Sequence, residues 1–179
     1  MDEVQENAGN VLLYLVSAES YAKTNTQIIK NLVQEKGLKG IYITINRPYQ
    51  NLIEMFSRKG IDTDKIFFID AITKVTGGKE VDVKNCVFLD SPTNLTDIAI
   101  AMRQAVNFME GEKFIFVDAI STLLIYNNDQ SVIKFAHFII GRIRDWKAEG
   151  IIISILKDMD EKLKSQLTEF CDSKIEVSQ

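Results

Sequence analysis

The residues best placed to do chemistry in this chain are Lys23 and Thr24, which follow an apolar run at residues 11–16. A Lys-Thr pair in this context ends the phosphate-binding motif G-x-x-x-x-G-K-[S/T]. In that motif the lysine contacts the β- and γ-phosphates and the hydroxyl holds Mg²⁺, while the glycines let backbone N–H groups turn towards the phosphates. The pattern predicts a phosphate-binding loop between a strand and a helix, with Lys23 and Thr24 among its ligands.

Both glycine positions of this motif carry side chains here, as Ser17 and Ala22. A Cβ at a position that needs a positive φ costs about 1–2 kcal/mol, so two such positions would weaken phosphate binding by roughly a few powers of ten. Glu19, inside the loop, would repel phosphates unless it points to solvent. The sequence predicts weak nucleotide binding at most. A purely structural role for Lys23 and Thr24, at the start of a helix, stays open.

A third candidate site residue, Asp118, ends the apolar run 113–118. In phosphoryl-transfer proteins an aspartate at this place helps to hold Mg²⁺. The alternative interpretation is a turn or helix-capping residue. Asp70 and Asp90 also follow apolar runs, and all three carboxylates could line a ligand cleft at the strand tips of an open α/β sheet, although helix capping explains each equally well.

Apolar runs alternate with segments of helical period, which is typical of a parallel sheet with crossover helices. Continuous apolar stretches such as 41–45 and 151–155 predict central strands that are covered on both faces. The expected strands are residues 11–16, 40–45, 65–69, 86–89, 113–118, 150–156 and 173–177. We therefore expect an α/β fold, a three-layer α/β/α sandwich with a mostly parallel sheet.

Helices are expected at residues 24–36, 94–110 and 129–149, and from Pro48 onwards. Asn94 is expected to cap the second of these, and Gly37, Gly111 and Gly150 to end the first three. The polar stretch 73–85, around Gly77-Gly78, predicts an exposed loop or a short hairpin. Without internal repeats or Pro-rich linkers, residues 1–179 are expected to form a single domain.

The sequence resembles the RecA/KaiC-like branch of P-loop ATPases over nearly its full length. Three segments in the family's order carry the resemblance: the altered loop 17–24, the strand and turn 40–52, and the strand that ends at Asp118. Gly60-Ile61-Asp62 also echoes a Gly-Ile-Asp of the family. The resemblance implies a RecA-like P-loop NTPase fold, with Lys23, Thr24 and Asp118 as the surviving residues that hold nucleotide and Mg²⁺.

The family's catalytic carboxylates, which orient the attacking water, fall on Asn46 and Arg47 in this chain. Neither can act as a base, because an amide has no basicity near neutrality and a guanidinium does not deprotonate. The resemblance therefore implies an inactive member without catalytic residues, which acts as a regulatory or scaffolding module through protein contacts. It also implies a setting, since this branch is widespread in archaea and is often tied to signalling, motor or clock assemblies.

Two other interpretations stay open. One is an ATP-binding protein or ATPase with a non-standard loop, in which Glu19 or Asp158 replaces the missing base. The other is an unrelated doubly wound domain whose ligand binds at the strand tips.

Composition limits the partners. The net charge of −4, from 21 basic and 25 acidic residues without long blocks of either sign, argues against nucleic acid. No stretch approaches the roughly 18–20 apolar residues that cross a membrane, and the acidic N-terminus is unlike a signal peptide. A cytoplasmic location is expected. Because the chain begins close to its first strand, we expect a monomer or a small homo-oligomer.

Other reactive residues carry little signal. Cys86 and Cys171 are far apart and lack neighbouring ligands, so reduced thiols are expected and structural zinc is not. His137, the only histidine, lies in a predicted helix without a Ser or Cys partner.

Overall fold

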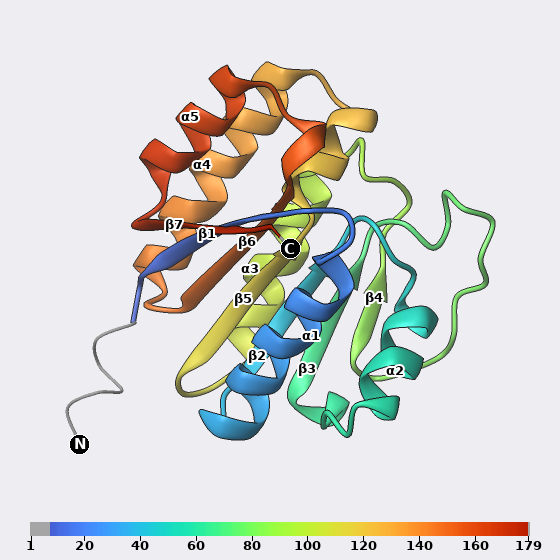
Figure 1. The fold of residues 1–179 in the computed structure, drawn as a ribbon. Coiled ribbons are helices and arrows are strands. Elements are labelled where there is room, and N and C mark those ends of the chain that lie inside the picture. The colour runs from blue at the N-terminus through green and yellow to red at the C-terminus, as the bar shows by residue number, and fades with distance from the viewer. Residues whose placement is uncertain (1–7, 179) are drawn as a thin grey trace.

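Seven strands form one sheet in the computed structural model, which describes residues 8–178 (Figure 1). The strand order is β4-β3-β2-β5-β6-β1-β7, and every neighbouring pair is parallel. The strands are β1 (Val11–Val16), β2 (Lys39–Thr44), β3 (Ile66–Asp70), β4 (Cys86–Phe88), β5 (Lys113–Asp118), β6 (Glu149–Ile155) and β7 (Ser173–Val177). Each predicted strand is confirmed to within one residue at either end. The acidic segment 1–6 lies outside the described residues.

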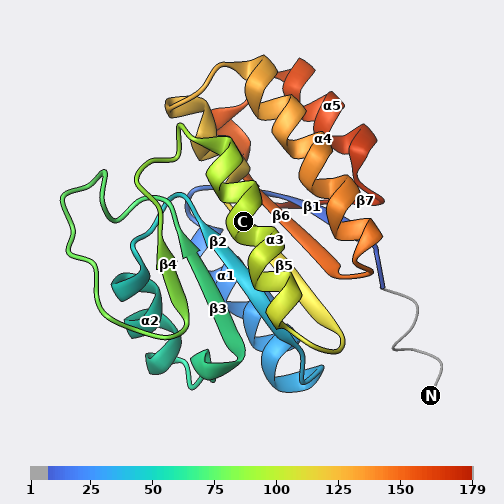
Figure 2. The same ribbon diagram turned by 180° about the vertical axis from the view of Figure 1, so that it is seen from behind.

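Helices cover both faces of this sheet. On one face lie α1 (Tyr21–Lys30), which continues as a π-helix over Asn31–Glu35, and α2 (Tyr49–Arg58) (Figure 1). Figure 2 shows the other face, which carries α3 (Leu95–Phe108), α4 (Asp129–Asp145) and α5 (Glu161–Phe170). Short 3₁₀ turns occupy Thr63–Lys65, Ile120–Ile125 and Leu156–Asp158. This is the expected three-layer α/β/α sandwich.

Consecutive apolar residues in the central strands serve two separate cores. In β2, Ile41 and Ile43 pack under α3, while Tyr42 points to the face covered by α1 and α2. Side chains alternate across a strand, so a strand that is covered on both faces is mostly apolar at successive positions, and its few polar side chains, such as Thr44 and Ser154, are buried. This explains why β2 and β6 are apolar without alternation.

The helix ends follow local chemistry in most places. The Asn94 side chain accepts a hydrogen bond from the Asp97 N–H at 3.3 Å, which confirms the predicted cap. Gly37 and Gly111 both have φ near +70° to +80°, as a residue that follows a helix often has. Residues 73–85 contain no helix or strand, so the exposed loop forms and the hairpin does not.

Two predicted helix boundaries are wrong. The helix expected at 24–36 begins three residues earlier, at Tyr21. The helix expected to end at Gly150 ends at Asp145, and Lys147, with φ +53°, makes the turn instead. Gly150 lies inside β6, where a Cβ would come within 2.9 Å of Val11 and Ile143 methyl carbons. Glycine is required there by packing and not by the helix end.

Two glycines offer a matched test of this packing. Gly40 pairs with Phe114 across β2 and β5, and a Cβ at Gly40 would overlap the Phe114 ring. Gly40→Ala is expected to lower the free energy of unfolding by about 1–3 kcal/mol. Gly141, inside α4, has open space around it, so Gly141→Ala is expected to raise that free energy by about 0.5–1 kcal/mol. Urea unfolding measures both, and two changes of the same sign would contradict this packing argument.

Candidate nucleotide site at the strand tips

The loop predicted to bind phosphate is a short turn between β1 and α1. The Ser17 hydroxyl and carbonyl both accept from the Ser20 N–H, each at 3.2 Å, and the Thr24 N–H donates to the Ser20 carbonyl at 2.9 Å. Among the described residues, Lys147 is the only non-glycine residue with a positive φ. Ser17 and Ala22 therefore have ordinary conformations, and the expected strain is absent.

Asp118 is the centre of the site. It is the last residue of β5 and is completely buried. The Tyr21 hydroxyl donates to one carboxylate oxygen and the Tyr42 hydroxyl donates to the other. The side chain of Asn25, on α1, also interacts with Asp118 and Tyr42. A carboxylate at the tip of β5 is thus bound by groups from β2 and from the first two turns of α1.

The titration of this cluster follows from its burial. Desolvation raises the pKa of Asp118, while the hydrogen bonds from Tyr21 and Tyr42 and the charge of Arg47 oppose that rise. Desolvation and the neighbouring Asp118 raise the pKa of Tyr21 and of Tyr42 well above the ordinary value for tyrosine. Both phenols therefore stay protonated throughout the neutral range, and each donates a hydrogen bond to the carboxylate.

Asn46 and Arg47 surround the other side of Tyr21. The Arg47 guanidinium lies over the Tyr21 ring, 5.2 Å from its centroid, and one of its nitrogens lies 3.3 Å from the sulfur of Met55. A hydrogen bond from the Asn46 side chain lowers the Tyr21 pKa, against the larger effect of burial. Asn46 and Arg47 therefore both contact Tyr21, whose hydroxyl donates to Asp118.

The remaining residues singled out from the sequence differ in their exposure. Lys23 is exposed on α1, and Thr24 is mostly buried in the same turn. Glu19 is exposed, and hydrogen bonds from its own backbone N–H and from Ser17 lower its pKa. Asp158 is exposed after β6. The role of Lys23, Thr24 and Asp118 in holding nucleotide stays a prediction.

Asp70 and Asp90 do not form a ligand cleft with Asp118. Asp70 is fully buried and accepts hydrogen bonds from the backbone N–H groups of Tyr49, Ile72 and Thr73 at 2.7–2.8 Å. It ties the start of α2 to the turn after β3, so the capping interpretation of Asp70 is confirmed. Asp90 is exposed and pairs with Lys74 at 2.8 Å. The cleft hypothesis is therefore wrong for this pair.

The remaining reactive side chains have ordinary surroundings. The His137 ring is exposed and packs on Phe170, with centroids 4.6 Å apart. Cys86 and Cys171 are free thiols, and burial raises the pKa of Cys171 to about 12. Within residues 8–178 no three potential metal ligands gather at one place. None of the helices in that range has the length and apolar character that a membrane crossing requires.

Sequence reasoning missed Tyr21, Tyr42 and Asn25. The available signal was a tyrosine inside the motif at Tyr21, and a second tyrosine in the middle of an otherwise aliphatic strand at Tyr42. A buried tyrosine needs a partner for its hydroxyl. The partner lies about a hundred residues away in the chain, so only the folded sheet identifies it.

The strand order and the placement of the loop, of Asp118 and of Asn46-Arg47 define a RecA-like α/β domain. A family model described as "ATPase: KaiC" matches residues 22–179. This chain belongs to that KaiC-like ATPase domain family. The match begins inside the altered loop, after Ser17 and Tyr21. A search of curated proteins finds no match.

Three similar solved structures come from Pyrococcus horikoshii OT3. A KaiC-like protein, PH0186, has a TM-score of 0.64 at 12% identity, over 96% of this chain and 73% of that one. PH0250, titled as a structural study, has a TM-score of 0.66 at 14% identity, over 98% of this chain and 85% of that one. The uncharacterized protein PH0321, in complex with an unknown peptide, has a TM-score of 0.66 at 13% identity, over 96% of this chain and 78% of that one. At these identities the likeness establishes the fold alone.

The two phenols predict how stability responds to alkaline pH. Their pKa values are raised on folding, so above pH ~10 the unfolded chain loses protons that the folded chain keeps. The free energy of unfolding should then fall by about 1.4 kcal/mol per pH unit for each protected phenol. Urea unfolding between neutral and alkaline pH measures this slope, and Tyr42→Phe should make it shallower.

Tyr42→Phe should also destabilise the protein at neutral pH, by about 1.5–3 kcal/mol, because Asp118 loses a hydrogen bond while buried. Tyr126 is the matched control at neutral pH, since its hydroxyl makes no hydrogen bond with the described residues. Equal destabilisation by Tyr42→Phe and Tyr126→Phe would contradict the role given to the Asp118 cluster.

Proposed function

We propose that this chain is a KaiC-like domain that does not hydrolyse ATP and acts through protein contacts, as a regulatory or scaffolding module. The observation that carries the proposal is the hydrogen bond of Tyr21 to Asp118. This bond occupies the carboxylate that an active relative would need for Mg²⁺. The archaeal, cytoplasmic and signalling setting implied by the resemblance belongs to the same proposal.

The residues present do not fit Mg²⁺-ATP in the way an intact loop would hold it. A hydrated Mg²⁺ has to reach the strand-tip aspartate, but Asp118 has no exposed surface and each of its oxygens accepts from a phenol. To open the site, Tyr21 would have to leave both Asp118 and the Arg47 guanidinium. Lys23 alone remains at the surface as a phosphate ligand, which supports weak binding at most.

Glu19, the carboxylate inside the loop, is not suited to act as the general base. A base that works near neutral pH needs a carboxylate pKa raised towards 7, and the pKa of Glu19 is lowered. Asn46 and Arg47 hold Tyr21 in place. This argues against the alternative of an ATPase in which Glu19 replaces the missing base.

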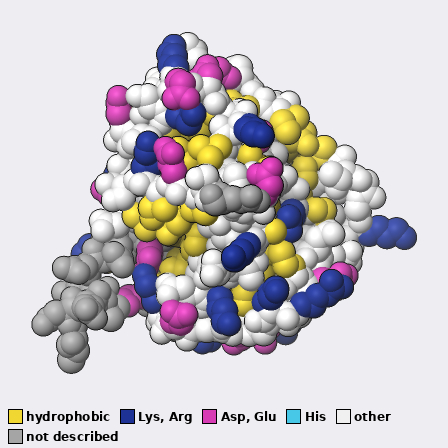
Figure 3. Space-filling model, in the orientation of Figure 1, with side chains coloured by type: hydrophobic (Ala, Val, Ile, Leu, Met, Phe, Trp, Pro, Cys, Tyr) yellow, Lys and Arg dark blue, Asp and Glu magenta, His cyan; other side chains and the backbone are white. Residues whose placement is uncertain are grey.

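The surface supports the part of the proposal that concerns proteins. Large apolar side chains are exposed on several elements, including Phe108 at 90%, Ile125 at 75% and Phe138 at 49%. Such residues are typical of contact surfaces when they gather, and Figure 3 shows hydrophobic side chains gathered on the face over β1 and β7. One of the similar structures, PH0321, holds an unknown peptide. With a net charge of −4, nucleic acid is a poor partner.

Calorimetry with ATP and Mg²⁺ tests the nucleotide part directly. The purified chain is expected to show no binding in the micromolar range and no release of inorganic phosphate above that of a blank. Lys23→Ala is the control, because Lys23 is the exposed cation of the motif. Micromolar affinity that Lys23→Ala removes would overturn the proposal and favour an ATP-binding protein with a non-standard loop.

A variant designed to gain Mg²⁺-ATP binding tests whether Tyr21 and the missing glycines are what prevents binding. The triple variant Ser17→Gly, Tyr21→Ser, Ala22→Gly restores both glycines and removes the phenol from Asp118. It is expected to bind Mg²⁺-ATP at least roughly tenfold more tightly than the parent, and Lys23→Ala in that background should cancel the gain. Circular dichroism reports whether the triple variant folds. A folded variant without any gain would show that Tyr21 and the lost glycines are not what prevents binding.

A further inference from the structure

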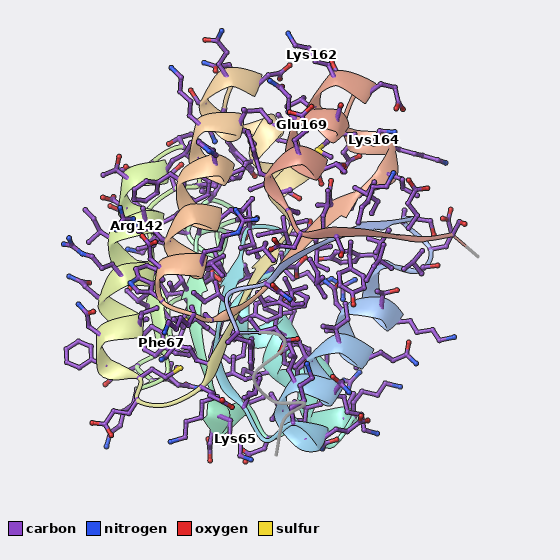
Figure 4. The ribbon with its side chains drawn as sticks, turned by 90° about the vertical axis from the view of Figure 1, so that its left-hand side faces the viewer. Lys65, Phe67, Arg142, Lys162, Lys164 and Glu169 are labelled. Carbon is purple, nitrogen blue, oxygen red and sulfur yellow. The ribbon has the colours of Figure 1, made fainter. Side chains whose placement is uncertain are left out.

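The edge of the sheet at β7 has a pattern of its own. β7 pairs with β1 on one side and has no neighbouring strand on the other within the described chain. Figure 4 looks towards this edge, and no helix lies in front of β7 there. An edge strand presents unpaired N–H and C=O groups, which can pair with a strand of another chain. The edge of β7 is therefore able to accept a further strand.

The side chains of β7 separate by face. Ile175 lies beside Tyr14 of β1, and Ser173 beside Leu12, on the side of the sheet where Leu12 and Tyr14 are only partly covered. Lys174 and Glu176 point to the opposite side and form an ion pair at 3.0 Å, with 42% and 54% of their side chains exposed. One face of the strand is thus apolar or neutral and the other carries one charge of each sign.

The backbone direction follows from the pairing with β1. The Ser17 N–H donates to the Val177 carbonyl at 3.0 Å, so every second residue, Ile175 and then Ser173, also turns its backbone groups towards β1. The N–H and C=O groups of Lys174 and Glu176 consequently turn to the outer edge. A partner strand would form its hydrogen bonds at Lys174 and Glu176.

We propose that β7 pairs antiparallel with β7 of a second copy of this chain, about a two-fold axis at Ile175. In this register Lys174 of each copy lies opposite Glu176 of the other copy. These are the hydrogen-bonded positions of the new strand pair, and their side chains lie directly opposite each other on one face. Opposite charges at such positions are favourable, and the symmetry provides the pair twice. Isologous self-complementarity of this kind is what a two-fold dimer requires.

The charges also select the register. A shift that keeps the same backbone groups at the edge places Lys174 opposite Lys174, or Glu176 opposite Glu176, and like charges at facing positions are unfavourable. The charges therefore favour the register centred on Ile175 over the registers centred on Lys174 or on Glu176. The dimer joins two sheets into one, and it continues the partly covered apolar face of β1 across the axis. It does not depend on whether the site at Asp118 is active.

Charge reversal tests the register. Light scattering on the full chain should give a dimer mass. Lys174→Glu and Glu176→Lys should each weaken dimerisation by roughly tenfold or more, because each places two like-charged pairs at the interface. An equimolar mixture of the two variants should dimerise again, because each chain then faces the opposite charges. Both variants lose the internal ion pair of β7, so this recovery cannot come from the fold of either chain.

Two controls accompany the mixture. Lys164→Glu reverses an ion-paired lysine on α5 and should leave the dimer unchanged. Ile175→Cys should give a disulfide-linked dimer under oxidation, because the facing Cα atoms of this non-hydrogen-bonded pair would be about 4.5 Å apart. Ser173→Cys should not, because its two copies would lie roughly 13 Å apart.

A monomer at every concentration would overturn the proposal. So would a dimer that survives both single reversals, or two variants that fail to associate when mixed. Phosphate release, measured on the same samples, keeps the outcome for the interface separate from that for the proposed loss of hydrolysis.

Discussion

The buried carboxylate of Asp118 constrains the site more than any other group. An ionised carboxylate costs several kcal/mol to bury without partners, so the fold has to supply donors at the tip of β5. It does so from two directions, with Tyr42 from β2 and Tyr21 from α1. Hydrogen bonds to a charged group contribute about 1.5–3 kcal/mol each. The three elements are thereby held together at the tip of β5.

Asp118 could bind a metal ion or accept hydrogen bonds from the two phenols, but it could not do both at the same time. A Mg²⁺ site needs an oxygen that water can reach, whereas the present cluster needs that oxygen to be dry and to accept from phenols. Arg47 contributes to the second arrangement, since its guanidinium covers the Tyr21 ring and its charge favours the ionised form of Asp118. Asn46 and Arg47 both contact Tyr21, and so they support its position against the buried carboxylate.

Much of this fold follows from local sequence pattern. Runs such as Ile41–Ile45 and the strand that ends at Asp118 predict the sheet, because a strand that is buried on both faces is mostly apolar and does not alternate with polar residues. Gly150 was misassigned since its reason is tertiary, a close approach of Val11 and Ile143. For the site, the sequence predicts where single residues lie in the elements but not which residues they contact. That Asp118 ends a strand is a local property, whereas its pairing with Tyr21 depends on which strand tips become neighbours.

The altered loop and the phenol are physically linked. With no residue in a left-handed conformation, the turn after β1 is short and α1 begins at Tyr21. A residue in the first turn of a helix at this place lies near the strand tips, which brings the Tyr21 hydroxyl within reach of Asp118. Glycine at positions 17 and 22 alone would leave the phenol and its two partners in place. In the proposed function, Ser17, Ala22 and Tyr21 therefore act together, and glycine at positions 17 and 22 without removal of the phenol would leave Asp118 covered.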